Sequence, residues 1–77
     1  MTTISLLRAA GEALYGPRWQ SDLARELHIS DRTMRRWLAG PADLPTGVAA
    51  DIRQLCETRA SHLKEVIDRL KVAATPN

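Results

Sequence analysis

The sequence predicts an all-α protein, and three features support that fold class. Apolar residues recur at spacings of three and four along most of the 77 residues, which is the period of a helix with one buried face. Gly-Pro pairs at 16–17 and 40–41 interrupt this pattern where helices are expected to end. Phe is absent and only three aromatic residues occur, so the core must come mainly from Leu, Ile, Val, Ala and Met, which suits packed helices better than sheets.

The first helix is expected to start at a cap formed by Thr2 and Thr3 and to end near Tyr15, because Gly16-Pro17 stops it. Four apolar residues would form its inner face: Leu6, Leu7, Ala10 and Leu14.

Two short helices should follow. Arg18 and Trp19 lead into the second, whose inner face would consist of Leu23, Ala24 and Leu27. His28-Ile29 makes a tight connection, and Ser30 then caps the third helix, which ends at Gly40-Pro41.

The fourth helix is expected to be long, because no Pro or Gly falls between Val48 and Ala74. The simplest interpretation is one helix from about Thr46, its cap, to Lys71, with a bend at Thr58 to Ser61 as the alternative. Arg59 interrupts its apolar stripe, which consists of Val48, Ile52, Leu55, Leu63, Val66, Ile67 and Leu70.

The pattern from Gln20 to Gly40 predicts two helices that cross steeply, which is a helix-turn-helix. Small Ala24 would let them approach closely and Ile29 would plug the turn, while Met34 and Trp37, three apart, share one face of the third helix. The opposite face then carries four charged residues: Asp31, Arg32, Arg35 and Arg36. A helix with one apolar side and several guanidinium groups on the other suits insertion into a DNA major groove.

This stretch resembles the helix-turn-helix of the Cro and phage-repressor type family. The matching positions are Gln20, Leu23-Ala24, Leu27, Ile29-Ser30, Thr33-Met34, Trp37 and Gly40. Two positions depart from the family pattern: His28 stands where a turn glycine is usual, and Trp19 where a small hydroxyl cap is usual. In size and layout the chain also resembles small autorepressors of phages and mobile elements, including the anti-CRISPR-associated repressors.

The resemblance implies a set of DNA contacts. Asp31, Arg32 and Arg36 would meet base edges, with Asp31 accepting from cytosine N4 or instead orienting Arg35. Contacts to phosphates would come from Arg18, Gln20, Thr33, Arg35 and the start of the fourth helix at Thr46.

The chain is expected to divide into a DNA-binding head (1–57), a helical dimerisation extension (58–74) and a frayed tail (75–77). An apolar strip beyond the head, formed by Leu63, Val66, Ile67 and Leu70, would pair two copies. Such a homodimer would read an inverted repeat in double-stranded DNA with half-sites roughly 34–36 Å apart. The alternative is that this strip folds back onto the first helix.

Composition argues against several other functions. The formal net charge of +2 is compatible with nucleic-acid binding, and a single cysteine, Cys56, offers neither a disulfide nor a zinc site. We find no nucleophile elbow or phosphate-binding loop, and so expect no enzyme, cofactor, metal or small-molecule substrate. The N-terminus lacks the pattern of a signal peptide and no stretch could cross a membrane, so a cytoplasmic protein is expected.

The sequence therefore predicts a homodimeric transcriptional repressor of a promoter, with its own promoter as the first candidate. Two alternatives stay open. One is a protein-interaction module, antitoxin-like or an adaptor, that uses the C-terminal apolar strip. The other is a DNA-bending protein with little sequence preference and a steep salt dependence.

Overall fold

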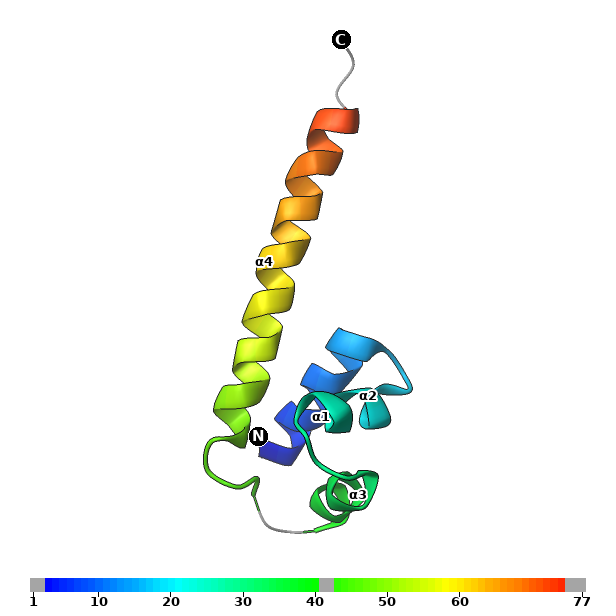
Figure 1. Cartoon of the computed structure of the whole chain (residues 1–77), viewed down its shortest axis with the longest axis vertical. Coiled ribbons are helices and arrows are strands. Elements are labelled where there is room, and N and C mark those ends of the chain that lie inside the picture. Colours follow the sequence, from blue (N-terminus) through cyan, green and yellow to red (C-terminus); the bar gives the residue numbers. More distant parts are fainter. Residues whose placement is uncertain (1–2, 41–42, 75–77) are drawn as a thin grey trace.

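The computed structural model describes residues 3–40 and 43–74, and this part of the chain contains helices and no strand. The helices are α1 (Thr3–Tyr15), α2 (Trp19–Glu26), α3 (Asp31–Ala39) and α4 (Val48–Ala74). The first three form a head beside the first half of α4, whose second half extends alone (Figure 1). The all-α prediction, with a long last helix, is thus confirmed. Among the described residues no helix is both long and apolar enough to span a membrane.

The core of the head draws one or more residues from every helix. Its buried members are Leu7, Trp19, Leu23, Ala24, Met34 and Ile52. A Cβ built on Gly11 of α1 would lie 2.1 Å from the Trp19 ring, so only glycine allows α1 to approach that indole. Trp19 is therefore a core residue at the first position of α2, where the resemblance would place a small cap.

Leu6 and Thr3 do not have the roles expected for them in α1. Leu6 is 51% exposed, because on a helix it lies about 100° from Leu7, which is fully buried. Thr3 is the first residue of α1 and binds the α3–α4 connection with its hydroxyl: Oγ1 accepts from the Leu44 N–H at 3.0 Å and donates to Asp43 Oδ1 at 3.0 Å. Thr2, like Pro41 and the predicted tail at 75–77, lies outside the described residues.

Helix α4 starts two residues later than expected and ends three residues later. The carbonyl of Gly47, whose φ is 94°, accepts from the Asp51 N–H at 3.0 Å, so Gly47 occupies the position before the helix and the predicted Thr46 cap is wrong. The helix then runs unbroken to Ala74, so the alternative of a bend near Thr58 is also wrong. Its 27 residues span about 40 Å, and the molecule measures 56 × 21 × 20 Å.

Candidate nucleic-acid interface

The turn between α2 and α3 is closed by two backbone hydrogen bonds. The His28 N–H donates to the Arg25 carbonyl at 3.2 Å, and the Ile29 N–H donates to the Ala24 carbonyl at 3.0 Å. His28 has a φ of 58°, so it occupies the left-handed region in which glycine is favoured. His28 thus replaces the usual turn glycine of the resembled pattern at a position where the backbone is left-handed.

Ser30 caps α3, as the sequence predicts. Its backbone is extended, and its Oγ accepts from the Thr33 N–H at 3.0 Å. The Ser30 hydroxyl in turn donates to Thr33 Oγ1 at 3.1 Å, which leaves the Thr33 hydroxyl proton available to another acceptor. The first turn of α3 is therefore fixed by side-chain hydrogen bonds.

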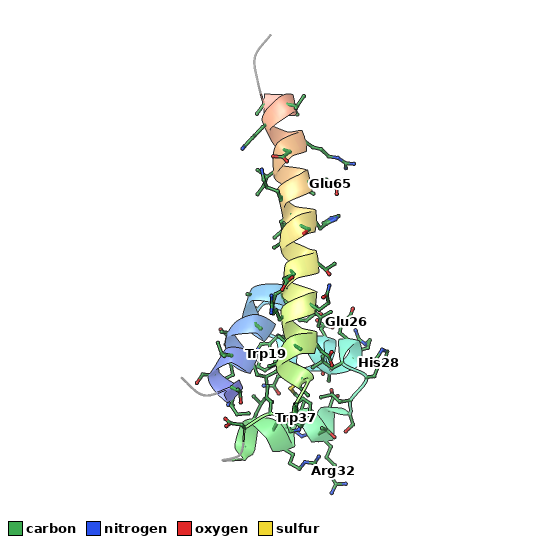
Figure 2. All side chains as sticks on the ribbon, turned by 90° about the vertical axis from the view of Figure 1, so that its left-hand side faces the viewer. Trp19, Glu26, His28, Arg32, Trp37 and Glu65 are labelled. Carbon is green, nitrogen blue, oxygen red and sulfur yellow. The ribbon has the colours of Figure 1, made fainter. Side chains whose placement is uncertain are left out.

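Helix α3 has one apolar and one charged face. Met34 is buried in the core, and Trp37 and Leu38 pack against it. The residues proposed to contact bases or phosphates on the other face are exposed: Asp31, Arg32, Arg35 and Arg36. Figure 2 places Arg32 at the end of the molecule opposite the C-terminal end of α4.

The cationic side chains of α3 differ from several others in the chain. Ion pairs within one helix join Arg25 to Asp22, Arg53 to Glu57, Lys64 to Asp68 and Arg69 to Glu65. Within the described residues, Arg32, Arg35 and Arg36 have no acidic partner, and Asp31 makes no ion pair with Arg35. The interpretation of Asp31 as an orienting group for Arg35 thus finds no support, and three guanidinium groups remain available to an external anion.

The remaining predicted phosphate contacts come from other segments. Arg18 precedes the first residue of α2 and makes no side-chain cap, and Gln20 lies in the first turn of that helix. Thr46 lies in the connection before α4. All three side chains are exposed.

The other described residues leave the predicted dimerisation strip largely uncovered. Leu63, Ile67 and Leu70 are exposed and Val66 is half-buried. The C-terminal half of α4 extends away from the head, so the alternative in which the strip folds back onto α1 is wrong (Figure 1).

Sequence reasoning missed an apolar hollow between α1 and α4. Its lining comprises Thr3, Leu6, Leu7, Ala10, Leu44, Ala49, Ile52 and Arg53. The signal available in the sequence was Leu44, a large apolar residue in a connection rich in turn-forming residues. No group of three or more His, Cys, Asp or Glu side chains gathers as a metal site in the described ranges.

Comparison with family models, with curated proteins and with solved structures gave no match for this chain. The resemblance to Cro-type and phage repressors therefore rests on the residues from Gln20 to Gly40.

Proposed function

We propose that this chain binds double-stranded DNA in a sequence-specific manner by laying α3 in the major groove. The observation that carries the proposal is the exposed face of α3, where Arg32, Arg35 and Arg36 have no acidic partner within the described residues. These arginines lie opposite the face that anchors the helix through Met34. A cationic helix held by its apolar side at one end of a molecule can enter a groove without unfolding the head.

Arg32 and Arg36 are four residues apart, so they lie on one side of α3 and would reach neighbouring base pairs. Each can donate two hydrogen bonds to guanine O6 and N7, which discriminates against a wrong base by roughly 1–3 kcal/mol. Asp31, in the first turn, would accept from cytosine N4.

Phosphate contacts would set the register of α3 in the groove. Arg35 is the candidate on α3 itself, together with the Thr33 hydroxyl proton that the cap leaves available. Arg18 and Gln20, at the start of α2, and Thr46, before α4, are the candidates from the flanking segments.

The biological role we propose is that of a homodimeric transcriptional repressor acting at an inverted repeat, with the chain's own promoter as first candidate. A dimer is favoured because Leu63, Ile67 and Leu70 are exposed on a part of α4 that no other helix covers. Repression by occupancy requires affinity for the site and nothing more, which a chain of 77 residues can supply.

Selection of bound duplexes from a random pool at near-physiological salt tests this function. We expect an enriched inverted repeat with half-sites about one helical turn, roughly 34–36 Å, apart. A folded protein that enriches no sequence would contradict specific recognition.

The second candidate function is a protein-interaction module, which the same exposed strip favours. Under that alternative Arg32→Ala and Arg36→Ala would leave activity intact, whereas Val66→Asp would abolish it. The two functions thus predict opposite outcomes for substitutions in α3.

A further inference from the structure

A hollow lies where the head meets the middle of α4, and we call it the junction hollow. Its volume is about 330 Å³, at the lower end of the range for small-molecule sites, roughly 300–1,000 Å³. Figure 2 places Glu26 at the end of the head nearer to the C-terminal half of α4, whereas Arg32 lies at the other end. The junction hollow is therefore separate from the candidate nucleic-acid interface. Three helices line it: Leu14 and Tyr15 come from α1, Glu26 from α2, and Leu55, Arg59 and His62 from α4.

Arg59 interrupts the apolar stripe of α4 at the junction hollow. It follows Ile52 by seven residues, which is about two turns of a helix, so both side chains leave the same side of α4. Ile52 is buried in the core of the head, whereas Arg59 lies beyond that core and is exposed. A guanidinium group thus lines the junction hollow at a position where the stripe would otherwise be apolar.

Opposite charges line the junction hollow without meeting. In the described part of the chain, Arg59 and Glu26 form no ion pair with each other or with another residue. Both still act on the Tyr15 phenol: burial raises its pKa, the negative charge of Glu26 raises it further, and the positive charge of Arg59 lowers it. A carboxylate and a guanidinium group are therefore both free to bind groups of opposite charge on one ligand.

The rest of the lining is largely apolar. Leu14 is buried and Leu55 is half-buried, and both line the junction hollow. Because the pKa of Tyr15 lies above 10.0, its hydroxyl is protonated near neutral pH and can donate a hydrogen bond. Apolar side chains with a few polar groups that fix orientation are the usual composition of a small-molecule site. A matching ligand thus needs an apolar group as well as charges.

We propose that the junction hollow binds a small zwitterion with an apolar group, which is the chemistry of an α-amino acid with an aliphatic side chain. The ligand carboxylate would accept hydrogen bonds from the Arg59 guanidinium, whose planar fork fits both carboxylate oxygens. The ligand ammonium group would donate to the Glu26 carboxylate. The aliphatic group would pack against Leu14 and Leu55.

Ligands with a single charge fit the junction hollow less well. A simple anion would pair with Arg59 but would face the Glu26 carboxylate, and a simple cation would pair with Glu26 but would face Arg59. Like charges placed close together oppose binding. A wholly apolar ligand would displace water from both charges and give them no partner. A zwitterion is complementary to both.

A ligand in the junction hollow would contact α1, α2 and α4 at once. Because this arrangement exists only in the folded chain, the ligand should raise the temperature of unfolding as its concentration rises. Arg59 and Glu26 are exposed to solvent, where ion pairs contribute little to affinity. We therefore expect weak binding, with a dissociation constant on the order of 1 mM.

The test is a titration of the full chain with L-leucine, followed by the backbone amide signals in two-dimensional NMR spectra. Saturable shifts are expected at Tyr15, Leu55 and Arg59. Two matched compounds separate the contributions of the charges, because isocaproic acid lacks the ammonium group of leucine and isopentylamine lacks its carboxylate. Each should bind about fivefold to tenfold more weakly than L-leucine, because each loses one charge-assisted pair.

Substitutions assign each charge of the ligand to one residue. Arg59→Gln should abolish the preference for L-leucine over isopentylamine, and Glu26→Gln should abolish the preference over isocaproic acid. The matched controls are Arg69→Gln and Glu65→Gln, which change the same charges on the part of α4 beyond the head (Figure 2). Both controls should keep the two preferences, and circular dichroism checks that all four variants are folded.

The absence of saturable shifts with L-leucine, or equal affinities for L-leucine and both matched compounds, would overturn the proposal. Preferences that persist in Arg59→Gln and Glu26→Gln would also overturn it, because the ligand would then bind elsewhere. The titration contains no DNA, so these outcomes do not bear on the proposed function. Failure of the chain to select a duplex would likewise leave this inference unchanged.

Discussion

The two halves of α4 carry one apolar stripe but differ in what covers it. In the first half Ile52 is 7% exposed and packs into the core with Val48 and Leu55 beside it. In the second half Leu70, five turns further on the same side, is 60% exposed, and no other helix of residues 3–40 and 43–74 covers it. Helical periodicity thus indicates which side of a helix is apolar. Whether another helix covers that side depends on how far the rest of the chain extends along it.

The largest expected effect is the difference in unfolding free energy between two truncations, one in each half of α4. Ile52→Ala should lower the free energy of unfolding by roughly 2–5 kcal/mol, because it leaves a cavity in a small core. Ile67→Ala should change it by less than about 0.5 kcal/mol in dilute protein, because its side chain is already exposed. Denaturant titration followed by circular dichroism measures both, and a comparable loss in the two variants would show that the C-terminal half packs on the head.

A smaller effect is expected from removing a hydroxyl in each region. Ser30→Ala should destabilise the protein by about 1 kcal/mol, because it removes the cap that receives the Thr33 N–H. Ser61→Ala, on the exposed middle of α4, should be neutral or stabilising by a few tenths of a kcal/mol, because alanine has the higher helix propensity. Equal unfolding midpoints for Ser30→Ala and the unmodified protein would mean that α3 does not depend on its cap.

The smallest expected effect lies at Tyr15, where the head meets the middle of α4. Burial, and then the negative charge of Glu26, raise the pKa of the Tyr15 phenol above its ordinary value of 10.0. The folded state therefore resists ionisation that the unfolded state undergoes, so the contribution of Tyr15 is complete below pH 10 and is lost as the pH rises above it. Thermal unfolding from pH 9 to 11 should show a shallower loss of stability in Tyr15→Phe, and parallel curves would contradict the raised pKa.

Much of the fold could be predicted from the sequence because strong local signals mark it. Gly16-Pro17 ends α1, Ser30 caps α3, and the spacing along α4 gives one long helix. The predicted Thr46 cap is wrong because Gly47 adopts a φ of 94°, which glycine tolerates, and so lies between Thr46 and the first residue of α4.

Contacts between segments distant in the sequence could not be predicted. Nothing local indicates that the Thr3 hydroxyl binds Leu44, 41 residues away, or that Gly11 makes room for the Trp19 ring. The sequence alone does not separate exposed Leu6 from buried Leu7, because adjacent leucines are equivalent until the direction of the inner face is known.

For the candidate site, helical periodicity predicts the exposed face of α3, because Met34 and Trp37 mark the opposite, core-facing side. The absence of acidic partners for Arg32, Arg35 and Arg36 among the described residues could not be predicted. Asp31 precedes Arg35 by four residues, and oppositely charged side chains at that spacing on a helix often form an ion pair. The main support for an external anion as the ligand is that three exposed arginines without an acidic partner share one helix, α3, whereas Arg25, Arg53, Lys64 and Arg69 are each paired with a carboxylate.

The most direct test of the central claim is the affinity of Arg32→Ala for the selected duplex, measured by fluorescence anisotropy beside Lys64→Ala. Both changes remove one positive charge, but Lys64 lies on the part of α4 beyond the head and pairs with Asp68. If α3 reads bases, Arg32→Ala should lose roughly 1–3 kcal/mol of binding free energy and relax specificity at one position, while Lys64→Ala binds as the unmodified protein does. Equal affinities for the two variants on the selected and on a scrambled duplex would contradict recognition by α3.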